Sequence, residues 1–101
     1  MYVLKLYVTG RTVRTERAIY NLYDICDKYL AGNYQVTIVD VLENPEVAEE
    51  EKILATPTVI RELPLPRRRL VGDLSDVRGV LRALDIPFSS EGVEDDSVEQ
   101  K

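Results

Sequence analysis

Apolar and polar positions change their period along this chain, and each period predicts a different element. Residues 2–8 form a nearly continuous apolar run rich in strand-forming side chains, which is typical of a central strand covered on both faces. Over residues 15–30, apolar positions recur every three or four residues, which predicts an amphipathic helix stopped near Gly32. A second strand is predicted at residues 34–41.

A second, shorter helix is predicted to begin at residues 44–46, which read Asn-Pro-Glu. Asn can cap a helix, Pro suits the first helical position, and Glu complements the positive end of the helix dipole. Val47, Ala48 and Leu54 would give this helix a narrow apolar stripe, while Glu49, Glu50, Glu51 and Lys52 would face water. We therefore expect a helix with a charged outer surface.

Two strands and a third helix complete the predicted order. The strands are expected at residues 58–63 and 67–71, with a stiff connection, Pro-Leu-Pro, at residues 64–66. Ser75 is the expected N-cap of the last helix, which residues 85–87 close. The order strand, helix, strand, helix, strand, strand, helix predicts an α/β, thioredoxin-like fold with a mixed four-stranded sheet and helices on both faces.

A Thr-Pro step within residues 53–60 lies between a helix and a β-branched strand, which is how thioredoxin-like domains present their cis-proline. Pro57 is therefore expected to follow a cis bond, with trans as the alternative, and the isomers at Pro64 and Pro66 stay open. A thiol reductase of this fold needs a Cys-x-x-Cys pair after its first strand, yet residues 8–14 contain no cysteine. A redox scaffold without redox residues favours a role in protein binding.

Length and composition exclude several classes of function. The 101 residues fit one domain with a single core, expected over residues 1–88. One cysteine and no histidine exclude an intramolecular disulfide, a Cys/His zinc site and His-dependent acid–base chemistry. The chain also lacks a Gly-x-Gly phosphate loop, a membrane-spanning apolar run and an N-terminal signal region. We expect a cytoplasmic protein that is not an enzyme and binds no cofactor, metal or membrane.

Charge is unevenly distributed along the chain. The net charge is −5, and residues 89–101 hold five acidic residues against one lysine. Because this segment lacks aromatic residues and sustained periodicity, we predict an acidic disordered tail, which either keeps the protein soluble or serves as a regulatory arm. An isoelectric point of about 4.7 and a nearly neutral body argue against nucleic-acid binding.

Cys26 leaves one enzymatic alternative open, a thiol-dependent redox protein. A nucleophile should occupy the loop or the first helical turn, whereas Cys26 lies about three turns into the predicted helix. A buried structural thiol is therefore the favoured interpretation.

Five phrases of this sequence, in this order, resemble the KaiB family, which is known from the cyanobacterial circadian clock. The resemblance extends from residue 2 to about residue 86. The matching phrases are residues 2–8, 40–45, 48–50, 52–58 and 72–75.

The resemblance implies a non-enzymatic partner of KaiC, a hexameric ATPase whose N-terminal ring binds KaiB proteins. In that clock the bound protein competes with a thioredoxin-like domain of a histidine kinase and helps to sequester KaiA. The resemblance and the local concentration of charge place partner-binding residues on the first and second helices and around the third and fourth strands. The expected binding residues are Arg17, Glu46, Glu49, Glu50, Lys52, Arg61, Arg67, Arg68 and Arg69.

The family is also metamorphic, which the resemblance extends to this chain. An oligomeric ground state, dimeric or tetrameric, has a rearranged C-terminal half, and a thioredoxin-like monomer binds KaiC. Family members commonly carry glycine at position 83 and an apolar residue at position 82, and alanine is favoured over glycine inside a helix by roughly 1 kcal/mol. Both differences favour the thioredoxin-like form. The expected determinants of the fold switch are Pro57, Pro64, Pro66, Arg82, Ala83 and Asp85.

KaiA is the doubtful partner in this resemblance. Thr37 and Glu43 stand where familiar clock members carry lysine, at a surface proposed to meet KaiA. Two interpretations therefore stay open: a regulator that also recruits KaiA, and a paralogue that binds a KaiC-type ATPase or a non-clock partner without KaiA.

Overall fold

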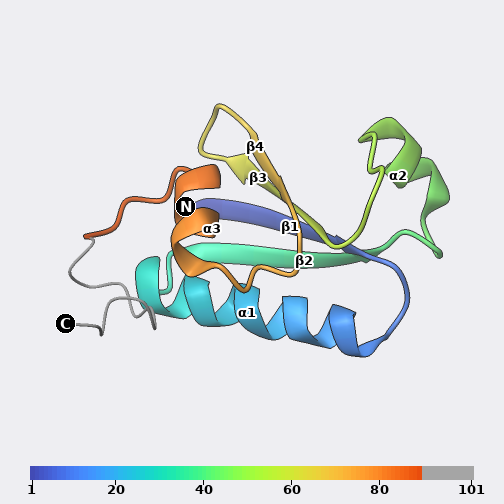
Figure 1. The fold of residues 1–101 in the computed structure, drawn as a ribbon. Coiled ribbons are helices and arrows are strands. Elements are labelled where there is room, and N and C mark those ends of the chain that lie inside the picture. The colour runs from blue at the N-terminus through green and yellow to red at the C-terminus, as the bar shows by residue number, and fades with distance from the viewer. Residues whose placement is uncertain (90–101) are drawn as a thin grey trace.

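The sheet is built around β1 (Tyr2–Val8), which pairs in parallel with β2 (Tyr34–Asp40) and antiparallel with β3 (Thr58–Leu63). β3 pairs antiparallel with β4 (Arg68–Val71), so the strand order is β2-β1-β3-β4. This computed structural model describes residues 1–89 and is shown in Figure 1. The predicted order of elements and the mixed thioredoxin-like sheet are confirmed.

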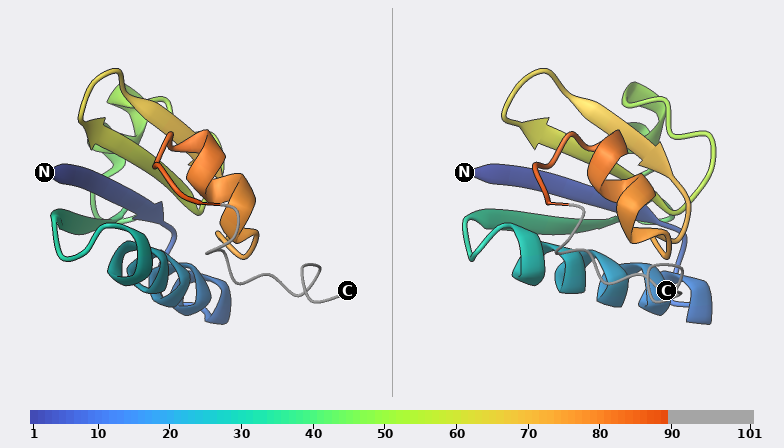
Figure 2. Two further views of the ribbon diagram at one scale, coloured as in Figure 1. Left: turned by 90° about the vertical axis from the view of Figure 1, so that its left-hand side faces the viewer. Right: turned by 60° about the vertical axis from the view of Figure 1, so that its left-hand side comes forward.

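Helices cover the sheet unequally. α1 (Val13–Tyr29) and α3 (Val77–Ala83) lie against one face, and α2 (Pro45–Glu50) lies on the other (Figures 1 and 2). On the face with two helices, alternate residues of β1 and β3 enter the main core. Tyr7 and Ile60 point to the opposite face and are also buried, so β1 is covered on both sides as its apolar run predicted. The main core contains Leu4, Leu6, Val8, Ala18, Leu22, Ile25, Cys26, Leu30, Val59, Leu74, Val80, Leu81, Leu84 and Ile86.

The first helix starts slightly earlier than its apolar period indicated. Thr12 is the N-cap, and its side-chain oxygen accepts a hydrogen bond from the Thr15 backbone N–H at 3.1 Å. At the other end, the Leu30 N–H donates to the Cys26 carbonyl, and Ala31 and Gly32 take left-handed backbone angles that turn the chain. The amphipathic period therefore located the helix, and the cap set its start.

Ser75 is not the N-cap of α3, contrary to the sequence prediction. The Asp73 carboxylate accepts the Ser75 N–H at 3.1 Å, which makes Ser75 part of the preceding turn. The chain enters the helix one residue later, where the Asp76 carboxylate accepts the Gly79 N–H at 3.1 Å. Within α3, Arg82 is exposed as expected, and Ala83 is the last helical residue rather than an interior one.

The peptide bonds that precede Pro57, Pro64 and Pro66 are all cis. This confirms the expectation for Pro57 and decides the two positions that the sequence left open.

The predicted apolar stripe of the second helix is wrong at Leu54. α2 ends at Glu50, and Lys52 turns the chain with a φ of 56°. Leu54 therefore lies beyond the helix and is 95% exposed, while Val47 and Ala48 are half-buried. Asn44 precedes the helix as expected, but its side-chain amide donates to the Asp40 carbonyl instead of capping the helix.

Arg61 was expected on a partner-binding surface, and this placement is wrong. Its side chain leaves β3 toward the face covered by α1 and α3, beside Leu4 of β1, and only 2% of the residue is exposed. One guanidinium nitrogen donates to the carbonyls of Leu84 at 2.8 Å and Asp85 at 3.1 Å. The second terminal nitrogen donates to the Pro66 carbonyl at 2.7 Å. Arg61 thus joins β3, the β3–β4 connection and the end of α3.

Cys26 is fully buried in the main core. Burial, with a smaller contribution from the Asp27 carboxylate, raises the pKa of its thiol to about 12. The reactive form of cysteine is the thiolate, which this environment disfavours. The position therefore argues against the redox alternative and agrees with a structural thiol.

Replacing Arg61 should destabilise the domain. In Arg61→Met the carbonyls of Leu84, Asp85 and Pro66 lose their donor, which should lower the free energy of unfolding by about 2–4 kcal/mol in urea denaturation. Arg68→Met is the matched control. Arg68 is exposed, and its replacement should change the free energy of unfolding by less than about 0.5 kcal/mol. Equal stability of Arg61→Met and the wild type would contradict this account.

Cys26 should resist alkylation in the native protein. At pH 8, iodoacetamide should modify it on the order of a thousandfold more slowly than a free cysteine, because the raised pKa leaves little thiolate and burial blocks access. Mass spectrometry should then show complete modification after denaturation in guanidinium chloride. Native labelling at the rate of an exposed thiol would revive the redox alternative.

Candidate protein-binding surface

α2 presents a mostly charged exterior at one end of the molecule. It stands apart from α1 and α3, near the ends of β1 and β2 (Figure 1). Glu46, Glu49 and Glu50 are exposed, as is Lys52 just after the helix, and none of the helix's own residues is fully buried. A helix that gives so little to the core is available for contact with another molecule. We call Glu46, Glu49, Glu50 and Lys52 the α2 surface.

The structure also exposes two large apolar side chains that the sequence analysis missed. Leu42 precedes α2 and is 66% exposed, and Leu54 follows it and is 95% exposed. The only sign in the sequence is an apolar residue in each loop that flanks a charged helix. Protein interfaces combine apolar area that becomes buried with a polar rim, so both leucines extend the candidate surface.

Hydrogen bonds hold each end of α2. Before the helix, the Asn44 backbone N–H and side-chain amide both donate to the Asp40 carbonyl at the end of β2. After the helix, the Arg69 guanidinium donates to the carbonyls of Glu51 at 2.7 Å and Lys52 at 3.1 Å. The α2 surface is therefore attached to the sheet through polar contacts.

Arg67 adds a second link between α2 and the sheet. It forms ion pairs with Glu51 at 2.7 Å and with Glu62 of β3 at 2.9 Å. The hydrogen bond from Arg67 lowers the pKa of the Glu51 carboxyl below its ordinary value. Tyr7 lies nearby, and burial, followed by the charge of Glu51, raises the pKa of its phenol.

The structure divides the arginines that were expected on one binding surface. Arg61 is buried, and Arg67 and Arg69 are engaged with the residues that end α2. Arg68 points to the other side of β4, and its guanidinium lies 3.8 Å from the Asp85 carboxylate. Arg17 is exposed on α1, away from α2. Of the expected residues, the acidic ones of α2 lie together with Lys52, and Arg67 and Arg69 adjoin them at the C-terminal end of the helix.

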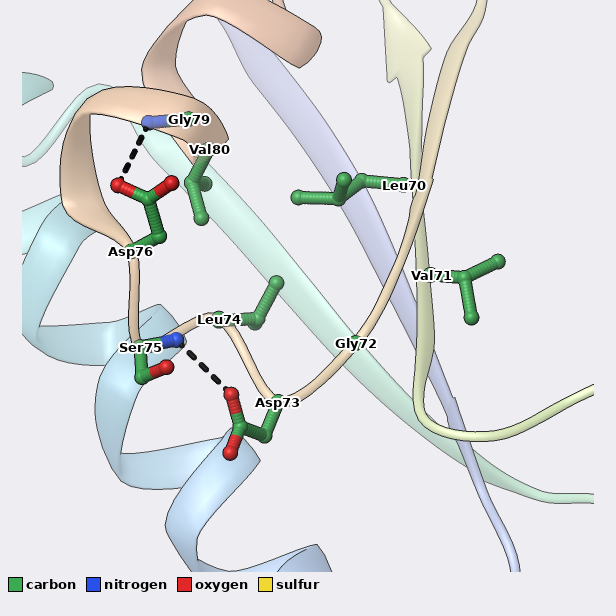
Figure 3. Close-up of a pocket in the computed structure, with 9 residues that line it drawn as sticks. All are labelled: Leu70, Val71, Gly72, Asp73, Leu74, Ser75, Asp76, Gly79 and Val80. Atoms are coloured by element: carbon green, nitrogen blue, oxygen red, sulfur yellow. Dashed lines mark hydrogen bonds between the residues drawn. The ribbon is translucent and has the colours of Figure 1, made fainter.

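A hollow of about 270 Å³ lies between β4 and α3 (Figure 3). Leu70, Leu74 and Val80 contribute apolar walls to it. The carboxylates of Asp73 and Asp76 accept backbone N–H groups of the turn and of the helix cap, so local structure accounts for both. Within residues 1–89, no group of side chains suited to hold a metal ion is present.

No helix within the described residues is long and apolar enough to cross a membrane. The predicted acidic tail at residues 89–101 lies, apart from Ser89, outside the part of the chain that the structure describes. The α2 surface is thus the arrangement within residues 1–89 that best fits a binding function.

The fold is similar to solved structures of thioredoxin-like proteins. The N-terminal domain of SasA from Synechococcus elongatus superposes with a TM-score of 0.69 at 18% identity, covering 83% of each chain. Oxidised mitochondrial thioredoxin 3 from Saccharomyces cerevisiae gives a TM-score of 0.66 at 14% identity, covering 83% of this chain and 76% of that one. At such low identity, these likenesses show the fold alone.

The sequence itself is similar to KaiB proteins. Residues 5–86 match the KaiB domain family. Circadian clock protein KaiB3 of a Synechocystis species is 54% identical, over 83% of this chain and 82% of its own. Circadian clock oscillator protein KaiB of Synechococcus elongatus is 51% identical, over 86% of this chain and 85% of its own. The chain therefore belongs to the KaiB family.

Proposed function

We propose that this chain is a regulator of the circadian-clock type that binds the N-terminal ATPase ring of a KaiC-type hexamer and is not itself an enzyme. Its relatives at about half identity are named as circadian clock proteins. The observation that carries the proposal is the α2 surface, a row of exposed carboxylates on a helix that adds no fully buried residue to the core. The protein acts in the cytoplasm as a monomer in its thioredoxin-like state.

The composition of the α2 surface suits a protein partner. Leu42 and Leu54 offer apolar area that is unfavourable in water and would be buried on binding. Glu46, Glu49 and Glu50 would form a charged rim that fixes orientation and selects a partner with complementary positive charge. The proposed contact therefore combines the carboxylates of α2 with one exposed leucine on each side of the helix.

We further propose competition with the thioredoxin-like sensor domain of a histidine kinase for the same ring. The likeness of this fold to the N-terminal domain of SasA supports the idea, because two proteins of one fold can present similarly shaped surfaces. Binding would then be mutually exclusive, and the outcome would depend on the two affinities and concentrations.

Recruitment of KaiA belongs to the proposed function as its open part, because two residues of this chain differ from those that the resemblance implies. Thr37 is exposed on β2, and Glu43 is exposed in the loop that follows it. The resemblance to familiar clock members implies lysine at both positions, so in this chain the charge would be lost at Thr37 and reversed at Glu43. A paralogue that binds a KaiC-type ATPase, or a non-clock partner, without KaiA is the alternative function.

A fold switch belongs to the proposal as well. An alternative, oligomeric state with a rearranged C-terminal half would compete with the thioredoxin-like form, and a partner that binds only the latter would draw the population toward it. Arg82 and Ala83 lie in α3, where both are compatible with a helix. The left-handed backbone of Asp85 ends that helix, and the three cis-prolines precede it.

Charge reversal on α2 tests the binding site. Glu49→Lys/Glu50→Lys should weaken binding to a KaiC-type hexamer in the presence of ATP by at least about tenfold, because a partner that accepts carboxylates would meet like charge. Size-exclusion chromatography would detect complex formation, and fluorescence anisotropy would measure the affinity.

Asp24→Lys is the matched control, since Asp24 lies on α1, away from α2, and should leave the affinity unchanged. Circular dichroism should show both variants folded. If the wild type does not bind any KaiC-type hexamer, the proposed partner is wrong. If the wild type binds and the α2 double variant binds equally well, the partner stands but the binding surface lies elsewhere.

A further inference from the structure

The packing contacts of α2 are too few to fix the position of this helix in the molecule. It has six residues, and none of them is fully buried. Isolated helices shorter than about 12–15 residues are marginal in water, and most helices in proteins depend on packing of an apolar face. The orientation of α2 must therefore come from groups outside the helix.

Asn44 holds the N-terminal end through the Asp40 carbonyl, and the β3–β4 hairpin supplies the groups at the C-terminal end of α2. Two nitrogens of Arg69 donate to consecutive backbone carbonyls, those of Glu51 and Lys52, where the chain leaves the helix. The carbonyls at a helix C-terminus lack intrahelical partners and carry partial negative charge, so a guanidinium is well matched to them. Arg69 thus fixes the backbone itself.

Arg67 fixes a side chain at the same place. One of its nitrogens donates to the Glu51 carboxylate at 2.7 Å, and the guanidinium also bonds both carboxylate oxygens of Glu62 on β3 at 2.9 and 3.0 Å. Because Glu62 belongs to the sheet, Arg67 bridges the sheet and the end of α2. The two arginines therefore act on α2 from one direction.

We propose that Arg69, assisted by Arg67, is a positioning residue for partner binding, a role that rests on the proposed function of the α2 surface. Arg69 holds the end of α2 against β4, so that Glu46, Glu49 and Glu50 meet the partner as one rigid row. Without this contact the helix would still form part of the time, but the partner would have to order it on binding, which costs affinity. The arginine thereby strengthens binding without meeting the partner.

This role differs from the direct contact that an interfacial arginine would make. Both terminal nitrogens of Arg69 already donate to carbonyls of this chain. Each of these nitrogens keeps a second N–H, so a direct contact with a partner would not by itself require Arg69 to release the end of α2. The two roles differ in the free protein: a positioning arginine orders α2 before any partner is present, whereas an arginine that serves only as a contact does not.

Backbone order in the free protein separates the two roles. Arg69→Met keeps the length of the side chain and removes its donors. NMR order parameters of the α2 amides should fall from about 0.85, typical of a rigid backbone, to below about 0.6, while those of β1 and β3 stay unchanged. Affinity for a KaiC-type hexamer should fall by about tenfold, and Arg69→Lys, which keeps one donor group, should be intermediate in both measurements.

Arg14→Met is the matched control, because Arg14 is an exposed arginine on α1, away from α2, and should alter neither α2 order nor affinity. Unchanged α2 order in Arg69→Met would overturn the positioning role, whatever the affinity. A loosened α2 with undiminished affinity would overturn it too. If the wild type binds no KaiC-type hexamer, the proposed function fails, whereas the order parameters of the free protein still decide whether Arg69 positions the helix.

Discussion

The buried guanidinium of Arg61 is the contact on which the C-terminal half of the structure depends. It lies inside the domain, yet both of its terminal nitrogens keep hydrogen-bond partners, because they donate to three backbone carbonyls. Two of these carbonyls belong to the C-terminal end of α3, where unpaired carbonyls and the helix dipole favour a cation. One side chain thereby fastens the last helix to the sheet and to the β3–β4 connection.

Arginines of the β3–β4 hairpin attach a short helix to each face of the sheet. Each of the helices α2 and α3 is too short to be stable alone, and each ends at carbonyls that an arginine of this hairpin binds. Arg61 points to α3 on one face, and Arg69 points to the end of α2 on the other. From charge alone, Arg61 and Arg69 would be assigned to one basic surface. In the structure each arginine instead attaches a different helix to the sheet.

This chain has the thioredoxin-like fold but lacks the reactive thiols of a thioredoxin-type reductase. A hydrogen bond between the Thr9 and Thr56 hydroxyls joins the loop after β1 to the cis-proline segment, and Thr12 caps α1 where a reductase would place reactive thiols. The single cysteine is buried in the core, with its pKa raised. Because one fold can host many functions, family membership and the exposed α2 surface say more about this protein than its resemblance to thioredoxins.

The sequence by itself determined the order of the elements, the fold class, the family and the charged exterior of α2, because periodicity, turn residues and helix starts are local properties of a chain. It misjudged Ser75, Leu54 and Arg61. Whether Ser75 caps a helix depends on where the Asp73 carboxylate lies, and the burial of Arg61 depends on which helix end lies over β3. Only the tertiary structure decided the partner of each arginine, since those partners are distant in the chain and meet only when the sheet and its helices pack together.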